Sequence, residues 1–353
     1  MGYAMDEKSV VTIRIPKKII AYILIAIVVI ALPCVAFWQF YPRARSIALQ
    51  PMTLTLVARN GTALTLNESS IAKLEEVESI GGFKTSAGYI RGIGNYTGIS
   101  ITTLCNLVGG INSSFSLRIT GGDGYSMVYT YEQIMGNDLI YFNPATGDET
   151  NHTQALTMII AYYKDGLNLT SDEGPLRVAF VGPEGVLTEG HWWIKNIVEV
   201  EIRPAIEEWT LLLKGALAEN ITRATFESGV NEHCHGVNWT DTKDNNIWTG
   251  MPLWLLVGRV DDGDAHTTNN TVRAFNDTLA LQGYTVKVIT GMENSCEFNS
   301  TRVMRNPNII LANRLNGAPL PEPYWPLKLV GSGLSDSEML GNVVEIQIIF
   351  HGS

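Results

Sequence analysis

The chain has 353 residues, 45% of them hydrophobic, and a formal net charge of −10 at pH 7. The first 45 residues hold six Lys or Arg and two Asp or Glu, so the remainder carries 19 basic and 33 acidic side chains. A surface with this acidic excess repels phosphate backbones, which excludes nucleic acid as an expected partner.

The first predicted element is a transmembrane helix at residues 19–41. Residues 19–40 contain no charged side chain, and this length is enough to cross the ~30 Å hydrocarbon core as a helix. Four Lys or Arg precede the segment and two follow it, which predicts that residues 1–18 are cytoplasmic and the rest extracellular. A cleaved signal peptide is the alternative, but its apolar region would be only about 7–15 residues long.

Glycosylation sequons are abundant after this segment. Eleven Asn-x-Ser/Thr motifs follow it and none precedes it, whereas chance predicts roughly three or four. We therefore expect a cell-surface glycoprotein, with a polar, unmodified surface as the alternative. The sequon asparagines are Asn60, Asn67, Asn95, Asn112, Asn151, Asn168, Asn220, Asn238, Asn269, Asn276 and Asn299.

The sequence beyond the predicted anchor repeats itself, which indicates two tandem domains at residues 51–203 and 207–349. "FSLRITGGDGYSMVYTYEQIM" at 115–135 aligns without a gap on "YTVKVITGMENSCEFNSTRVM" at 284–304. Four shorter pairs follow the same order: 52–56 with 209–213, 96–104 with 248–256, 174–180 with 325–331, and 196–202 with 342–348.

The local patterns within each copy favour strands. Short runs of β-branched and aromatic residues are bounded by Gly, Asn and Pro, as in 116–120, 176–181, 284–289 and 342–349. Helices are expected only at three short segments. These are residues 100–108, 154–163 and 252–260. The fold class is therefore α+β and mostly β.

The motifs resemble those of the oxidoreductase molybdopterin-binding domain, the fold of sulfite oxidase. The first copy contains "YTGISITTL", "DGYSM", "KDGLNL", "GPLRVAFVGP" and "IVEVEI", and the second "WTGMPLWLL", "LNGAPLP", "WPLKLVG" and "VVEIQI". The resemblance covers nearly all of residues 51–349 and implies two tandem domains of that fold. From the resemblance, together with the predicted anchor and the abundant sequons, we expect a membrane-anchored surface protein of a prokaryote, most simply an archaeal one.

The resemblance also implies a molybdenum site, because catalytic members hold the metal through one cysteine thiolate ahead of the turn motif. The first copy has no cysteine there, and Cys105 after its turn is expected to be a small buried residue. In the second copy Cys234 precedes Trp248 by 14 residues, and a thiolate is a suitable soft ligand. The segment after its "PLK" strand, however, lacks the basic residues that active members place near the pterin.

A disulfide between Cys234 and Cys296 is the competing use of this cysteine. Both residues belong to the second copy, and such bonds persist outside the cell. Closing the loop would add about 2–4 kcal/mol of stability.

The flanking histidines suggest a metal site. If residues 231–237 are extended, His233 and His235 point to one face and could chelate Zn²⁺ or Cu²⁺. His266, Glu232, Asp262 or Asp264 could supply a third ligand. Solvated surface imidazoles are the alternative.

We therefore expect a membrane-anchored extracellular protein with two degenerate molybdopterin-binding-fold domains and a non-catalytic binding or cell-surface role. No cofactor is expected. The expected partners are the membrane, through residues 19–41, and a cell-surface protein or glycan that the sequence does not identify. A molybdenum-cofactor oxidoreductase with its site in the second domain is one alternative, and a surface transition-metal module is another. Fold alone does not decide among them.

Overall fold

The computed structural model describes residues 52–86, 88–152, 154–231, 234–263 and 274–351. Residues 50–353 form one compact unit. The predicted transmembrane helix at 19–41 lies outside the described residues. Within the described ranges, no helix is both long and apolar enough to cross a membrane.

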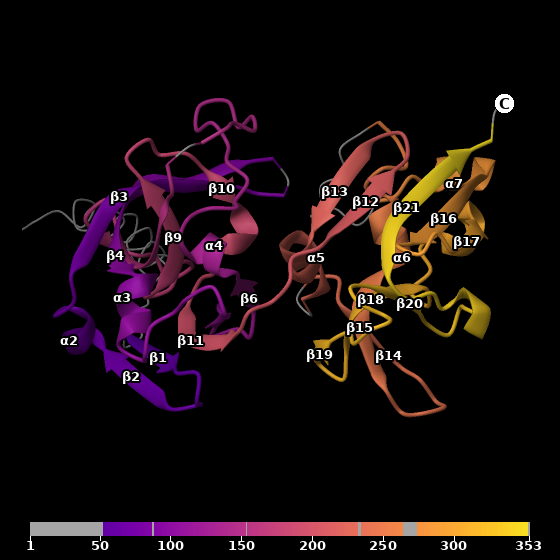
Figure 1. Ribbon diagram of the computed structural model, residues 1–353. Coiled ribbons are helices and arrows are strands. Elements are labelled where there is room, and N and C mark those ends of the chain that lie inside the picture. The colour runs from indigo at the N-terminus through magenta and orange to yellow at the C-terminus, as the bar shows by residue number, and fades with distance from the viewer. Residues whose placement is uncertain (1–51, 87, 153, 232–233, 264–273, 352–353) are drawn as a thin grey trace, which may run out of the picture. The chain divides into compact units, whose positions relative to one another are not determined.

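Short strands and a few short helices make up the described residues, which confirms the mostly-β prediction (Figure 1). In the first half (residues 53–204) they are β1 (Thr53–Val57), β2 (Ala63–Asn67), α2 (Glu68–Ile71), β3 (Glu76–Lys84), β4 (Ile90–Ser100), α3 (Ile101–Asn106), β5 (Phe115–Gly121), β6 (Ser126–Tyr129), α4 (Tyr131–Ile134), β7 (Thr157–Lys164), β8 (Leu167–Asn168), β9 (Arg177–Gly182), β10 (Thr188–Glu189), η1 (Gly190–Trp192) and β11 (Ile197–Pro204).

The second half (residues 210–350) has a parallel set of elements. They are β12 (Thr210–Lys214), β13 (Ala218–Thr222), α5 (Arg223–Val230), β14 (Val237–Thr240), β15 (Ile247–Pro252), α6 (Leu253–Val257), α7 (Asp277–Gln282), β16 (Tyr284–Thr290), β17 (Ser295–Asn299), α8 (Ser300–Val303), β18 (Ile310–Leu315), β19 (Ala318–Pro319), β20 (Lys328–Val330), η2 (Asp336–Glu338) and β21 (Val343–Phe350).

The order of strands is the same in the first sheet of each half. Sheet 1 has the order β2-β1-β11-β5-β6, and sheet 3 has the order β13-β12-β21-β16-β17. In both, the first strand of the half pairs in parallel with its last strand, with Thr55 opposite Glu199 and Leu212 opposite Glu345. The aligned segments 115–135 and 284–304 each form hairpin, turn and helix at matching positions. The sequence repeat is therefore also a repeat of topology.

The remaining strands form a second sheet in each half. Sheet 2 has the order β10-β3-β4-β7-β8, with β9 paired to β3 and β7. Sheet 4 has the order β14-β15-β18-β19, with β20 paired to β18. The turn motifs "YTG" and "WTG" lie on β4 and β15, and "PLR" and "PLK" lead into β9 and β20. Each half thus brings its turn motif and its PLR or PLK motif into the same sheet.

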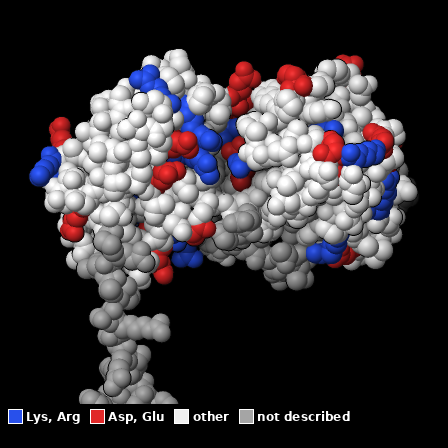
Figure 2. Space-filling model, turned by 90° about the horizontal axis from the view of Figure 1, so that it is seen from below, with Lys and Arg blue, Asp and Glu red and all other residues white. Residues whose placement is uncertain are grey.

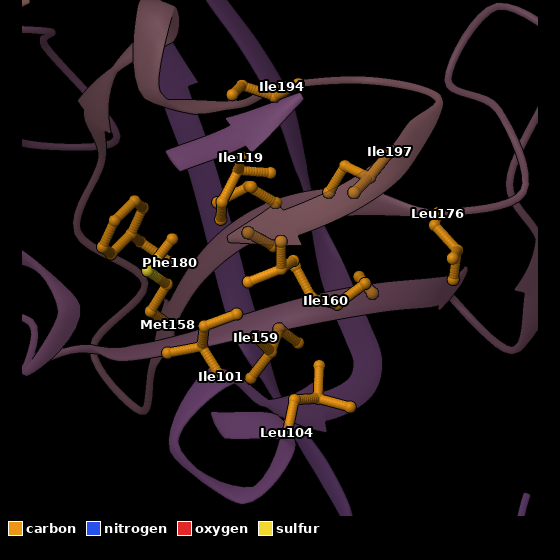
Figure 3. Packing of buried hydrophobic residues seen from close by; sticks show 14 of the residues in the cluster. Ile101, Leu104, Ile119, Met158, Ile159, Ile160, Leu176, Phe180, Ile194 and Ile197 are labelled. Carbon is orange, nitrogen blue, oxygen red and sulfur yellow. The ribbon is translucent and has the colours of Figure 1, made fainter. Parts of the chain in front are cut away.

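The core of the first half lies where its two sheets and α3 meet. Figure 3 shows Ile119 from β5, Ile160 from β7, Phe180 from β9 and Leu104 from α3 packed together, and all four are buried. A second cluster fills the second half, and a smaller one lies on sheet 4 beside Trp248. These apolar contacts hold each pair of sheets together.

The helices expected at 100–108 and 252–260 occur as α3 and α6, but the helix expected at 154–163 is wrong. Thr157–Lys164 forms β7, an inner strand that pairs with β4, β8 and β9. Residues 158–162 are all buried. A strand covered on both faces has a continuous apolar run, which periodicity alone does not separate from a short helix.

Candidate functional site

Cys234 and His235 do not lie on a strand. The helix α5, which the sequence analysis did not predict, ends at Val230, and the chain then turns before β14 begins at Val237. In this turn the Cys234 N–H donates to Asn231 O (2.8 Å) and the His235 N–H donates to Gly229 O (3.0 Å). Residues 234 and 235 are therefore not extended, so the condition on which the histidine pair was predicted is not met there.

The described residues do not form the predicted histidine metal site. His233 and His266 lie outside the described residues, and His235 is half-buried in the turn. Among the described residues, no three His, Cys, Asp or Glu side chains are grouped so as to hold a metal ion.

The expected disulfide between Cys234 and Cys296 is absent from the structure, where both are free thiols. Cys296 lies on β17, with its thiol 3.8 Å from Glu338 O. Cys234 is exposed and lies near Tyr125 of the first half, whose pKa is raised to about 12 mainly by burial, with a smaller contribution from Cys234. The two cysteines do not meet because the unpredicted helix α5 directs the chain around Cys234 toward the first half rather than toward β17. Cys105 is buried on α3, as expected.

The turn motif of the second half lies against a stacked lysine. The Lys328 ammonium nitrogen is 4.4 Å from the ring centroid of Trp248 and 3.9 Å from that of Tyr324. The two rings meet edge to face, with centroids 5.8 Å apart. Trp239 lies opposite Trp248 on the paired strand β14. Burial lowers the pKa of Lys328, while Asp241 and Asp244 act in the opposite direction.

The first half has an arginine in the equivalent place. Arg177 is only 1% exposed, and its guanidinium lies 5.5, 5.9 and 5.3 Å from the ring centroids of Phe83, Tyr96 and Trp193. Its Nη1 pairs with Glu173 at 2.5 Å, while Nε and Nη2 have no hydrogen-bond partner among the described residues. Burial raises the pKa of Tyr96 to about 12.

These two clusters are the same feature of the repeat. Tyr96 aligns with Trp248 in the turn motif, and Arg177 aligns with Lys328 in the PLR or PLK motif. In each half a cation stacks on the aromatic residue of the turn, an arrangement that stabilises by about 0.5–2 kcal/mol. The sequence analysis aligned both motifs but did not foresee the contact, although an aromatic residue and a cation at matched repeat positions were a usable signal.

The strand register also identifies the counterpart of Cys234. Val237 pairs with Gly250 on β15, and Val77 pairs with Gly98 on β4. Since the two glycines are equivalent in the turn motif, Val77 corresponds to Val237, and the residue three before it is Leu74. The first half therefore has a leucine where the second has its cysteine.

The cation–aromatic stacks fill the place where the turn strand approaches the PLR or PLK strand. Two surface hollows of about 440 and 140 Å³ are lined by residues of the first half and the segment joining the halves, and neither includes Cys234, Trp248 or Lys328. On the face shown in Figure 2, acidic and basic side chains lie in small mixed groups and most of the surface is uncharged.

A largely buried pair of titratable side chains lies at the end of sheet 2. The His191 Nε2 is 3.9 Å from the Glu189 carboxylate. Burial, with help from Arg223, lowers the pKa of His191 to about 3. Burial, with help from Glu149, raises the pKa of Glu189 to about 7. Since burial favours the neutral form of each group, the pair is not an ion pair near neutral pH.

This pair predicts opposite pH dependences for two matched variants. The unfolded His191 binds a proton below about pH 6.5 and the folded one does not, so stability is lost as the pH falls from 6.5 toward 3. His191→Gln lacks this loss. Its free energy of unfolding, measured relative to that of the wild type, should therefore be about 2 kcal/mol higher at pH 5 than at pH 7. For Glu189 the wild type loses stability as the pH rises from 4.5 to 7, because the carboxyl ionises first in the unfolded chain. Glu189→Gln should therefore gain stability relative to the wild type over that range. Thermal unfolding midpoints of the wild type and the two variants, measured between about pH 4.5 and 7, test both predictions. Parallel curves of midpoint against pH for all three proteins would contradict the shifted pKa values of His191 and Glu189.

No protein-family model matches the chain, and no curated protein sequence matches it. Among solved structures, the chain is similar to the sulfane dehydrogenase SoxCD from Paracoccus pantotrophus, with 12% sequence identity and a TM-score of 0.35. The match covers 74% of this chain and 59% of the other chain, so this chain spans less than two thirds of that protein.

Proposed function

We propose that the chain is a membrane-anchored, exported protein whose two degenerate molybdopterin-binding-fold copies have a non-catalytic, binding or structural role at the cell surface. The observation that supports this most directly is the absence of a cysteine ahead of the turn motif in the first half. By strand register, Leu74 stands where the second half has Cys234. Catalytic members of the resembled family hold molybdenum through a cysteine thiolate at this place, so the first half lacks that ligand.

The chemistry of the cysteines supports the same proposal. Burial raises the pKa of the Cys105 and Cys296 thiols to about 12, and it also raises the pKa of the Cys234 thiol. The thiolate is the form that binds metals, so these surroundings disfavour ligation. The exposed position of Cys234 is the one feature that favours the alternative of a molybdenum oxidoreductase.

Elemental analysis of the full chain tests the proposal. The protein would be purified in detergent from the membranes of a host that makes molybdenum cofactor, and analysed by plasma mass spectrometry. We expect no stoichiometric molybdenum in the wild type or in Cys234→Ser. Stoichiometric molybdenum that disappears in Cys234→Ser would replace the proposal with the oxidoreductase alternative.

The same samples test the transition-metal alternative. Stoichiometric zinc or copper that is lost in His233→Ala and His235→Ala, but kept in His351→Ala, would establish a metal-binding module. His351 is a suitable control because its ring lies beside Thr285 at the far end of the second half.

A further inference from the structure

The sequons fall into two groups by the surroundings of their asparagines. Asn269 lies outside the described residues. Eight of the other ten are exposed: Asn60, Asn67, Asn112, Asn151, Asn168, Asn220, Asn238 and Asn299. Asn95 and Asn276 are half-buried. Their side-chain amides are also engaged, since Asn95 Nδ2 donates to Glu78 and Asn276 Nδ2 donates to Asp262 Oδ2 at 2.7 Å.

Five of the exposed asparagines lie on edge strands. Asn67 ends β2, Asn168 lies on β8, Asn220 on β13, Asn238 on β14, and Asn299 ends β17. Each of these strands is at the end of its sheet order. The sequon on an inner strand is that of Asn95 on β4, whose amide is engaged.

One longer edge strand lacks a sequon, and it is covered by the other half of the chain. The edge strand β6 contacts α5, where Arg223 Nη2 donates to the backbone oxygen of Val128 at 2.8 Å. The other sequon-free edges, β10, β19 and β20, have only two or three residues each and, like the two-residue edge β8, offer few free backbone groups to another strand. Shielding therefore matters most at the longer edges β2, β13, β14 and β17.

We propose that Asn67, Asn168, Asn220, Asn238 and Asn299 carry N-linked glycans that shield the edges of the four sheets from pairing with other chains. The proposal rests on the export proposed above. Exposed edge strands are templates for association unless something bulky or charged blocks them, and a glycan is bulky and soluble. At these five edges a glycan would block pairing with another strand, as α5 does where it covers β6.

The modification is a group transfer from a lipid-linked oligosaccharide phosphate. The bond between the first sugar carbon and the phosphate oxygen breaks, and a bond from that carbon to Asn Nδ2 forms. Nδ2 loses one proton, the lipid phosphate leaves with the electron pair, and nothing is oxidised or reduced. Because Nδ2 is the attacking atom, its hydrogen bonds at Asn95 and Asn276 oppose the transfer in the folded chain.

Site-by-site glycopeptide mass spectrometry of the full chain, purified from a host that glycosylates exported proteins, tests the assignment. We expect glycans at the five edge asparagines and none at Asn95 or Asn276. Glycans at the loop sequons Asn60 and Asn151 with bare edge sites would overturn this inference alone. A chain bare at every sequon would overturn both the inference and the proposed export.

A second measurement tests the shielding role itself. One variant removes three edge glycans through Thr240→Val, Thr301→Ala and Asn220→Gln, while a matched control removes loop glycans through Asn60→Gln and Asn151→Gln. Thr240 and Thr301 are exposed, and Thr222 is left intact because it caps α5. Light scattering should show concentration-dependent association of the edge variant and not of the control, at equal circular dichroism. Equal size distributions for both variants and the wild type would overturn the shielding role.

Discussion

Arg177→Met is expected to destabilise the first half by about 3 kcal/mol. Arg177 is 1% exposed, and its side chain pairs with Glu173 and is enclosed by three aromatic rings. Methionine fills much of the same volume but leaves the largely buried Glu173 carboxylate without its partner. Removing one member of a buried pair costs more than removing both.

Two further variants separate this effect from simple loss of packing. Arg177→Met with Glu173→Gln should recover part of the loss, because the unpaired charge is gone. Lys328→Met, at the equivalent place in the second half, should cost only about 0.5–1 kcal/mol, since Lys328 is half-exposed and loses mainly its ring contacts. Urea unfolding of the three variants provides the comparison. Equal losses of unfolding free energy in Arg177→Met and Lys328→Met would show that the ion pair between Arg177 and Glu173 contributes no stability.

Gly250→Ala is expected to destabilise the second half by about 1–3 kcal/mol or more. A β-carbon at Gly250 would overlap the backbone oxygen of Leu311 on β18, and one at Gly98 would overlap that of Ile160 on β7. The pairing register shifts at both glycines, so the strands cross closely there. The glycine of the turn motif is therefore required by the contact between two backbones, which no rotamer change relieves.

Gly263→Ala is the matched control for this prediction. A β-carbon there meets no atom of the described residues within 4 Å, and the residue belongs to the same half. The unfolding midpoint should fall by several degrees for Gly250→Ala and stay near the wild-type value for Gly263→Ala. A similar small change in both variants would show that β15 can move away from β18 at little cost.

The repeated fold was largely predictable from the sequence, because each copy places the same short segments in the same order. The gapless match of 115–135 to 284–304 already specified two equivalent hairpins. The inner strand β7 was not predictable in the same way, since its buried apolar run has no polar face to reveal its period. The helix α5 was missed because "RATFESGV" includes the weak helix formers Thr225, Gly229 and Val230, and its contacts with the first half stabilise it.

The candidate site was less predictable than the fold. The sequence indicated Cys234 and its neighbouring histidines by their chemistry, but their orientation depended on α5 and the turn after it. The stacked Arg177 and Lys328 depend on strand pairing between segments far apart in the chain, which local patterns do not report. Only the alignment of the two copies could have linked "PLR" with the aromatic residue of the turn motif.

The position of the last strand in each half has a consequence for how the chain folds. β11 lies between β1 and β5, and β21 lies between β12 and β16, so the final strand to be synthesised is the central one. A nascent chain that ends before Ile197 has only the separate hairpins β1–β2 and β5–β6 of sheet 1. Such hairpins are marginally stable alone. Each half therefore completes its first sheet only when its C-terminal strand joins two hairpins from distant parts of the chain, and pairing over such sequence distances is slow.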